Sequence, residues 1–86
     1  MRYIIRPSFR KSYKKLSRQT QTKVDVRLRI FFLNESNPIL NNHELHGKYN
    51  NHRSINITGD YRAIFFIQDN IAIFTGIGTH SELFGR

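Results

Sequence analysis

The N-terminal half of the chain spaces its apolar residues with the period of a helix. Residues 3–6 have the composition of a short strand, which Pro7 ends because proline has no backbone N–H to donate. After this strand, apolar side chains recur twice at positions i, i+4 and i+7, and this spacing places each set on one face of a helix. The two sets are Phe9, Tyr13 and Leu16, and then Val24, Leu28 and Phe31.

The polar residues around these sets predict where the helices begin and end. Ser8 is of a residue type that caps helices, so we expect the first helix to start there. Residues 17–22 contain no apolar side chain and predict a break, and the Asn and Pro residues within 34–38 oppose continuation of the second helix. Because the break is short, we expect an antiparallel helical hairpin.

The C-terminal half has the pattern of a sheet. Residues 41–51 are polar and predict a loop. Residues 54–58 alternate apolar and polar side chains, as a half-buried strand does, whereas the apolar residues 61–67 predict a central strand covered on both faces. A last strand is expected over residues 71–77, and tight polar turns make the three strands an antiparallel meander.

These elements predict one α+β domain over residues 1–86. The expected order is β-α-α-β-β-β, with a mainly antiparallel sheet and the N-terminal helical hairpin packed on one of its faces. A chain of this length buries roughly 60–65% of its unfolded surface, so we expect a thin core.

The composition indicates an anionic partner. Fourteen Lys and Arg residues stand against six Asp and Glu residues, which gives a net charge of +8. Repulsion at this charge destabilises a small fold, so we expect a polyanion such as RNA to bind. The chain has no cysteine and no long apolar run, so we expect a cytoplasmic protein with no membrane partner.

The first helix carries the largest group of basic residues. Arg10, Lys14 and Arg18 form one stripe along it, which an RNA backbone could contact. The alternative is an ordinary solvated helix face. The candidate RNA-binding residues of this surface are Lys11, Lys14, Lys15 and Arg18, with Lys23 and Arg27 as further members.

The end of the chain, residues 78–86, carries the most specific chemistry. His80 and Phe84 are spaced so that a single helical turn would place both rings on one face. A ring that exchanges protons near neutral pH, beside a ring that can stack, suits a nucleobase and its ribose phosphate. The alternative is a surface histidine and a phenyl ring that anchors the C-terminus.

Four histidines raise the question of a metal site. His43, His46 and His52 lie in a predicted loop, none pairs with another at the i, i+4 spacing of a helix, and no carboxylate-rich shell surrounds them. We therefore expect no metal and no cofactor. A Ser-His-Asp hydrolase is also disfavoured, because the chain has no nucleophile elbow.

Two stretches, taken together, resemble one known family. Residues 43–62 begin with His43-Glu44-Leu45-His46-Gly47 and end with Asp60-Tyr61-Arg62, and residues 78–85 read Gly-Thr-His-Ser-Glu-Leu-Phe-Gly. This combination resembles the RelE/ParE superfamily of bacterial toxins, and most of all its YafQ branch. The closing block is the specific part, whereas the first half agrees only in element order and basic charge.

The resemblance implies a RelE-like fold and a metal-free endoribonuclease that enters the ribosomal A site and cleaves mRNA during translation. It also implies a type II toxin–antitoxin system, with a toxin that is monomeric when free and a cognate antitoxin that neutralises it in a hetero-oligomer. The family's catalytic positions match His43, Asp60 and His80, and its aromatic positions match Tyr61 and Phe84.

One position departs from the family pattern. Asn56 stands where YafQ-like toxins carry a histidine in the first strand of the meander. An amide forms hydrogen bonds but does not exchange a proton near neutral pH. Any proton-transfer role of this position must therefore be lost or taken by another group.

The chemistry of RNA cleavage can be matched to these residues. The 2′-hydroxyl is the nucleophile, so the protein has to supply a base for it, an acid for the leaving 5′-oxygen and cations for the phosphate. His43 and His80 can be acid and base in either order. Arg53 and Arg62 can contact phosphate oxygens, although Arg62 could equally pair with Glu82 or Asp69 on a face of the sheet.

Two other functions stay open at this point. A ParE-like toxin has the same fold and inhibits DNA gyrase without hydrolysis, and a degenerate toxin would only bind nucleic acid or antitoxin. The pair His43 and His80 favours cleavage, whereas Asn56 favours one of the alternatives. The expected partners of the cleaving toxin are mRNA, the ribosome through its 16S rRNA, and the cognate antitoxin.

Overall fold

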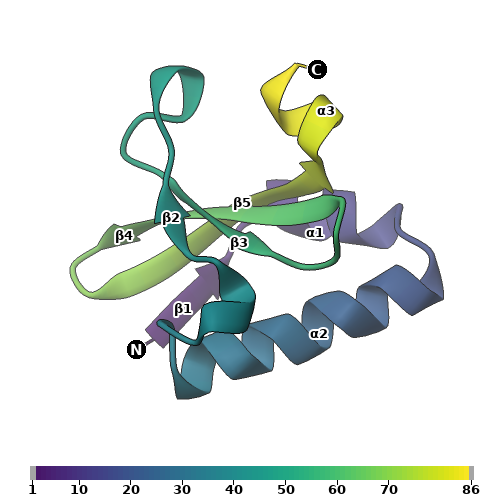
Figure 1. Cartoon of the computed structure of the whole chain (residues 1–86), viewed down its shortest axis with the longest axis horizontal. Coiled ribbons are helices and arrows are strands. Elements are labelled where there is room, and N and C mark those ends of the chain that lie inside the picture. The colour runs from purple at the N-terminus through teal and green to yellow at the C-terminus, as the bar shows by residue number, and fades with distance from the viewer. Residues whose placement is uncertain (1, 86) are drawn as a thin grey trace.

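A five-stranded sheet runs through the molecule and separates two layers of unequal size (Figure 1). The computed structural model describes residues 2–85. The strands are β1 (Arg2–Ile5), β2 (His43–Glu44), β3 (Arg53–Asn56), β4 (Tyr61–Gln68) and β5 (Ile71–Thr79). They lie in the order β1-β5-β4-β3-β2, and β1 runs parallel to β5 while the other neighbours are antiparallel. The predicted meander and the mainly antiparallel sheet are confirmed.

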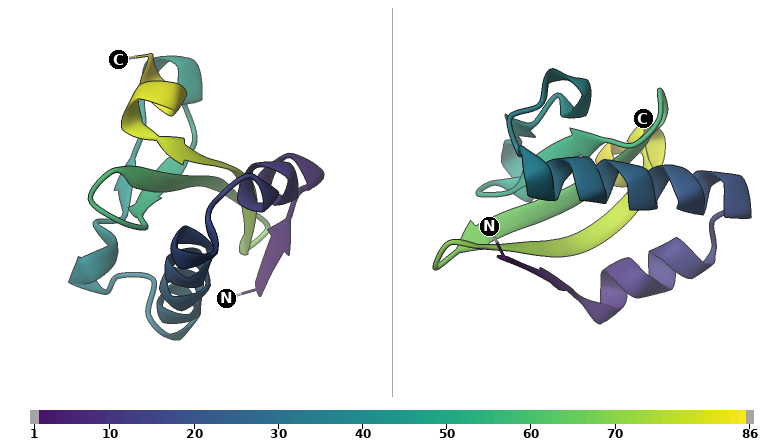
Figure 2. Two further views of the ribbon diagram at one scale, coloured as in Figure 1. Left: turned by 90° about the vertical axis from the view of Figure 1, so that its right-hand side faces the viewer. Right: turned by 90° about the horizontal axis from the view of Figure 1, so that it is seen from below.

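Two helices, α1 (Pro7–Lys14) and α2 (Arg18–Leu33), cover one face of the sheet (Figure 2). Three residues join them, and they run in opposite directions, as the predicted hairpin requires. Their apolar faces close the main core against the sheet. In this core the ring of Phe31 packs edge-to-face on Phe65 and Phe74, with centroids 5.0 and 5.4 Å apart.

The start of α1 differs from the prediction. The helix begins at Pro7, which suits a first helical position because it has no N–H that needs a partner. Ser8 does not cap the helix. Its hydroxyl instead donates to the carbonyl oxygen of Thr75 on β5 at 2.6 Å, so this serine ties α1 to the sheet.

The predicted break over residues 17–22 is also wrong, because α2 begins at Arg18. Ser17 caps the helix: its hydroxyl accepts a hydrogen bond from the N–H of Thr20 at 3.2 Å. The polar residues that follow form the first turn of α2 on the surface, where a helix needs no apolar residue.

The segment predicted as a loop, residues 41–51, contains regular elements. Strand β2 pairs with β3 so that His43 lies opposite Ser54, and the 3-10 helices η1 (Pro38–Leu40) and η2 (Gly47–Tyr49) flank it. A strand of two residues is too short to show an alternating pattern in the sequence. This edge strand brings His43 into the sheet.

The other face of the sheet carries a smaller layer, formed by η2 and the C-terminal helix α3 (His80–Phe84) (Figure 1). Leu45, Ile64 and Leu83 are its buried centre. Because Ile64 lies in this layer while Phe65 lies in the main core, β4 is covered on both faces, as predicted.

Helix α3 turns back over the sheet directly after β5. Thr79 and Glu82 form a capping box: each side chain accepts a hydrogen bond from the other residue's N–H, at 3.1 and 2.8 Å. Gly78 permits the close approach, since a Cβ atom there would lie 3.1 Å from Cγ of Leu83. The helical turn predicted for the tail is confirmed, and Arg86 lies outside the described residues.

Candidate active site

A shallow pocket of about 360 Å³ lies between β2, β4 and α3, on the face of the sheet opposite α1 and α2. Two larger hollows, of about 500 and 590 Å³, lie at the edge of the sheet where β2 pairs with β3. The smaller pocket is the candidate active site, because two imidazoles, a guanidinium and a phenyl ring converge on it. Its lining residues are Asn41, His43, Leu45, Ser54, Arg62, His80 and Phe84.

Strand register explains why these side chains meet. His43 pairs with Ser54, which pairs with Ile64, so one row of side chains crosses the sheet from β2 to β4. Arg62 lies two residues from Ile64 on the same face, opposite Gly78 of β5. Helix α3 begins directly after β5, so its first residue, His80, reaches the pocket from the other side.

His43 is exposed, and a short hydrogen bond orients its ring. Its Nδ1 lies 2.8 Å from the carbonyl oxygen of Asn41. A carbonyl only accepts hydrogen bonds, so Nδ1 carries the proton, and Nε2 of the neutral ring is left with a lone pair. Asn41 follows η1 in a left-handed conformation, with φ 47°. His43 is therefore arranged to accept a proton at Nε2.

His80 and Phe84 lie on one face of α3, with ring centroids 4.9 Å apart and planes at 57°. Their predicted juxtaposition is confirmed. The N–H of His80 donates to the carbonyl oxygen of Asp60 at 3.2 Å, which joins α3 to the β3–β4 turn. The half-buried ring of Phe84 also packs edge-to-face against Tyr49, at 5.7 Å between centroids. Helix α3 is therefore held by the β3–β4 turn at His80 and by Tyr49 at Phe84.

Arg62 is half-buried and held by main-chain oxygens. Its Nη1 donates to the carbonyl groups of Thr58, Gly59 and Tyr61 at 3.2–3.3 Å. The carboxylate of Glu82, a possible ion-pair partner from the sequence, accepts instead from the N–H of Thr79. The turn therefore holds the guanidinium of Arg62 in the wall of the pocket.

Three residues predicted for the site lie elsewhere. Asp60 is exposed in the β3–β4 turn and is not among the lining residues of the pocket, although its carbonyl contacts His80. Tyr61 is half-buried and packs against the main core on the helix side of the sheet. Arg53 donates from Nε to Oδ1 of Asn42 at 2.8 Å and lines the two edge hollows.

Of two polar residues of β3, Ser54 escaped the sequence-based prediction, whereas Asn56 was singled out there only for its departure from the family pattern. The hydroxyl of Ser54 and Oδ1 of Asn56 are buried and have no hydrogen-bond partner among the described residues. Ser54 is fully buried, pairs with His43 across the strands and lines the pocket. The alternation of β3 could have revealed it, since Ile55 belongs to the main core and its neighbours must face the other way.

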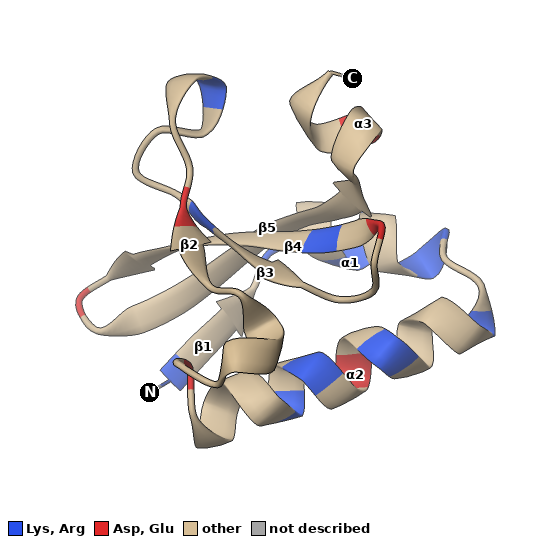
Figure 3. Cartoon of the chain, in the orientation of Figure 1, with Lys and Arg blue, Asp and Glu red and all other residues tan. Residues whose placement is uncertain are grey.

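Positive charge is concentrated in the N-terminal half (Figure 3). Ten of the fourteen Lys and Arg residues precede residue 34, against one of the six acidic residues. The basic residues of α1 and the start of α2 are exposed, as an RNA-binding surface needs, but they lie outside the pocket. The exposed basic residues predicted to bind RNA are Lys11, Lys14, Lys15 and Arg18.

Arg27 is an exception within this basic surface. It is half-buried, and its Nη1 donates to the carbonyl oxygens of Ile39 and Asn56, each at 3.1 Å. This arginine links α2 to η1 and β3, and its place in an RNA footprint stays a prediction.

Within residues 2–85, no three His, Cys, Asp or Glu side chains are grouped so that they could hold a metal ion. No helix in the same range is long and apolar enough to cross a membrane.

The fold is similar to that of solved bacterial toxins. YafQ from E. coli matches with a TM-score of 0.82 and 20% identity, over 99% of this chain and 100% of that chain. A chain of the E. coli DinJ–YafQ toxin–antitoxin complex matches with a TM-score of 0.78 and 21% identity, over 96% of each. A YoeB/ParE toxin from Agrobacterium tumefaciens matches at 0.75 and 14%, over 93% and 99%. The architecture is the one that these solved toxin structures share.

A family model described as "Bacterial toxin of type II toxin-antitoxin system, YafQ" matches residues 1–85. The chain belongs to this family, and the resemblance found in its sequence is confirmed. A comparison with curated proteins found no match. The protein is a toxin of the type II class.

Proposed function

We propose that this toxin is a ribosome-dependent endoribonuclease that cleaves mRNA in the A site. The observation that carries the proposal is the convergence of His43, His80 and Arg62 on one pocket. Two imidazoles can supply a base and an acid near neutral pH, and a guanidinium can stabilise the charge that develops on phosphate. Phe84, beside His80, offers a ring on which a base can stack.

The tautomer of His43 supports an assignment of the two proton transfers. Nε2 of His43 accepts the proton of the 2′-hydroxyl as the 2′-oxygen forms its bond to phosphorus. The bond from phosphorus to the 5′-oxygen breaks, and protonated His80 donates to that oxygen. The products are a 2′,3′-cyclic phosphate and a 5′-hydroxyl, and the two imidazoles have exchanged protonation states.

Arg62 and Asp60 act around this pair. The carbonyl groups of the turn restrain the guanidinium of Arg62, so its donors toward phosphate are preorganised. Asp60 is a positioning residue, because its carbonyl oxygen holds the N–H of His80. Neither role uses a metal or a cofactor.

The proposed partners are mRNA, the ribosome and a cognate antitoxin. The exposed basic residues of α1 supply an electrostatic surface for the phosphates of 16S rRNA. One chain of the DinJ–YafQ toxin–antitoxin complex has the fold of this protein, and that complex supports neutralisation by an antitoxin in a hetero-oligomer.

One experiment tests the cleavage activity. An mRNA is translated in a purified system with wild-type protein, His80→Ala or Leu33→Ala, and the products are mapped by primer extension. Leu33 is 82% exposed at the end of α2 and lines neither the pocket nor the larger hollows, so its variant is the control. We expect discrete A-site cuts with the wild type and the control, and none with His80→Ala. Wild-type protein that leaves the mRNA intact contradicts the proposal.

Asn56 supports a second candidate. Its Oδ1 is buried and has no hydrogen-bond partner within residues 2–85, and the residue pairs across the strands with Arg62, where an amide cannot transfer a proton. A toxin without cleavage would act as a ParE-like gyrase inhibitor or as a binder only. Growth arrest with gyrase-dependent DNA damage and intact mRNA would favour the inhibitor.

A further inference from the structure

A chain of five rings crosses the smaller layer of the molecule, starting at the candidate active site. It runs from His80 to Phe84 at 4.9 Å between centroids, and on to Tyr49 at 5.7 Å. It continues from Tyr49 to His52 at 6.1 Å and from His52 to Phe66 at 5.3 Å. His80 and Phe84 belong to α3, Tyr49 ends η2, His52 lies between η2 and β3, and Phe66 belongs to β4. Only the tertiary structure brings these parts of the chain together.

Two of the five rings have a packing role in the smaller layer. Tyr49 and Phe84 pack against the buried cluster of the smaller layer, whereas His52 and Phe66 do not belong to that cluster. Both of these rings are half-buried and keep an accessible part. Packing therefore accounts for the middle of the row but not for its far end.

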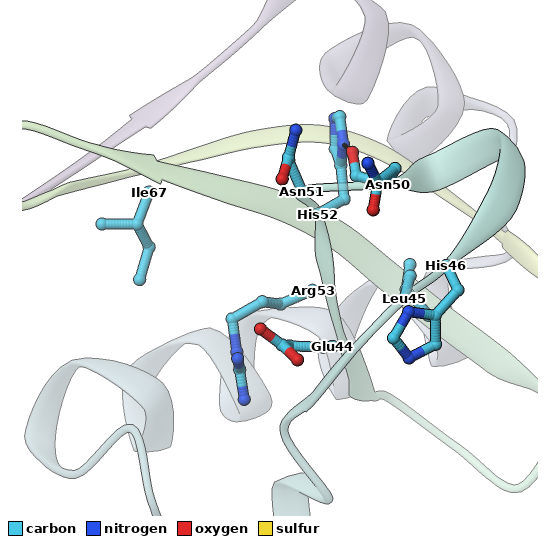
Figure 4. A pocket seen from close by; sticks show the side chains of 8 residues that line it. All are labelled: Glu44, Leu45, His46, Asn50, Asn51, His52, Arg53 and Ile67. Carbon is cyan, nitrogen blue, oxygen red and sulfur yellow. Dashed lines mark hydrogen bonds between the residues drawn. The ribbon is translucent and has the colours of Figure 1, made fainter.

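The far end of the row borders two hollows that share lining residues. One, of about 380 Å³, includes His52 and Phe66, and the other, of about 500 Å³, shares Asn50, Asn51 and His52 with it. Figure 4 shows Asn50, Asn51 and His52 gathered at one side of the larger hollow. Side-chain amides and imidazoles are groups that hydrogen-bond to the edges of unpaired bases.

A cation accompanies the row. Nζ of Lys48 lies 5.4 Å from the ring centroid of Tyr49. A basic side chain beside rings of this kind is the arrangement by which proteins hold single-stranded nucleic acid: the rings bind bases and the cation binds the backbone.

We propose that this row is a binding path for single-stranded RNA on the 3′ side of the cut. The inference rests on the proposed function, in which His80 protonates the 5′-oxygen of the 3′ nucleotide, so a row that starts at His80 leads toward that nucleotide and its successors. Tyr49 and His52 contact successive bases, the Asn50–Asn51 hollow holds a base edge, and Lys48 contacts phosphate. Adjacent rings are turned by 57–86°, which favours separately held, splayed bases over a continuous stack.

Binding is measured by fluorescence anisotropy with a labelled ten-nucleotide RNA that carries a 2′-deoxy nucleotide at the cleavage position, so that it stays intact. Tyr49→Leu and His52→Leu remove a ring and keep apolar volume, whereas Tyr49→Phe and His52→Phe keep a ring. Tyr3→Leu is the matched control, because Tyr3 packs on Phe32 at 3.9 Å, outside both hollows.

Each leucine variant of the row should weaken RNA binding about five- to tenfold, the lower end of the range expected for loss of one stacked base. The phenylalanine variants and Tyr3→Leu should bind like the wild type. Leucine variants that are folded by circular dichroism and bind with unchanged affinity would overturn the inference.

Abasic nucleotides test the same path in the wild-type protein and do not depend on any variant folding. An abasic residue one or two positions 3′ of the cut should weaken binding, and it should weaken Tyr49→Leu much less. Equal effects on both proteins, or no effect at the 3′ positions, would contradict the path.

The primer-extension assay separates this inference from the proposed function. Cleavage by the wild type together with unaltered cleavage and binding by the ring variants would leave the ribonuclease standing and remove the path. Intact mRNA together with the expected abasic effect would remove the ribonuclease and leave an RNA-binding row.

Discussion

Arg27 reaches across the protein from α2 to the main-chain carbonyl of Asn56 on β3, with 3.1 Å between Nη1 and the oxygen. The same nitrogen donates to the carbonyl of Ile39 at 3.1 Å. One side chain thus holds the long helix, a 3-10 turn and the strand that runs beside the pocket. This relationship, and others like it, leads to five predictions.

Replacing Arg27 with Ala should lower the free energy of unfolding by about 1–3 kcal/mol, because two carbonyl groups, of which that of Asn56 is half-buried, lose a charged donor. Urea denaturation with circular dichroism measures the change. Lys23→Ala, on an exposed position of the same helix, should change stability by less than about 0.5 kcal/mol. Equal effects of the two substitutions would show that Arg27 is an ordinary surface charge.

Tyr13→Phe should reduce stability at neutral pH by about 0.5–1.5 kcal/mol, because the phenol donates to the carboxylate of Asp25 at 2.8 Å. That hydrogen bond, followed by burial and the charge of Asp25, raises the pKa of Tyr13 above 10.0. A raised pKa means that the folded state favours the protonated phenol. Its contribution is present below pH 10 and is lost as the pH rises through the folded-state pKa. The stability gap between wild type and Tyr13→Phe should therefore close in alkaline solution, and a gap that widens there would contradict this account.

Gly78→Ala should destabilise the protein by about 1–3 kcal/mol through overpacking, since its Cβ would lie 3.1 Å from Cγ and 3.2 Å from Cδ2 of Leu83. The displaced α3 would carry His80 away from the pocket, so cleavage should fall as well. Gly76→Ala is the matched control on the same strand, because a Cβ there meets nothing within 4 Å. Thermal melts and primer extension of the two variants measure both effects, and similar melting temperatures would refute the packing argument.

Loss of either proposed proton-transfer group should slow cleavage by about a hundredfold to ten-thousandfold. The pH dependence of the cleavage rate that remains in each variant identifies which histidine is the base and which is the acid. His43→Ala should lose the limb of the rate profile that rises with pH, because a base must be unprotonated, and His80→Ala should lose the limb that falls. Single-turnover cleavage of programmed ribosomes between pH 5 and pH 9 measures the profiles. The reverse pattern would exchange the two assignments.

Neutralising the basic surface of α1 should weaken RNA binding in a salt-dependent way. The triple variant Lys11→Gln, Lys14→Gln, Lys15→Gln should reduce the slope of log affinity against log salt by about 2 for single-stranded RNA. Anisotropy titrations at several salt concentrations measure the slope, with His80→Ala as a control that keeps it. An unchanged slope in the triple variant would place the electrostatic contact elsewhere.

Local periodic signals were sufficient for much of this fold. The helical spacing of Phe9 and Tyr13 and the alternation around Ile55 need only their neighbours in sequence, and the structure places them as expected. His80 and Phe84 are a similar case, because an i, i+4 pair is set by one turn of helix. Strand β2 gave no such signal, since two residues cannot display a period.

The sequence predicted the roles of single side chains less well than it predicted the helices and strands. Tyr61, expected to stack on RNA, packs against the main core because it shares a face of β4 with Ala63 and Phe65. Arg27, expected on an RNA-binding surface, is directed at carbonyl groups from two other elements. The composition gives the number of charged residues, but it does not show which of them form hydrogen bonds within the protein.

The sequence by itself determined the helices, the meander, the excess of positive charge and membership of the YafQ family, because each is a local pattern or a motif. Only the tertiary structure decided that His43, Arg62 and His80 share one pocket and that Tyr49, His52 and Phe66 continue the row that begins at His80. The physical reason is register: strand order and pairing set which distant residues lie on one face, and those choices depend on the packing of the whole chain.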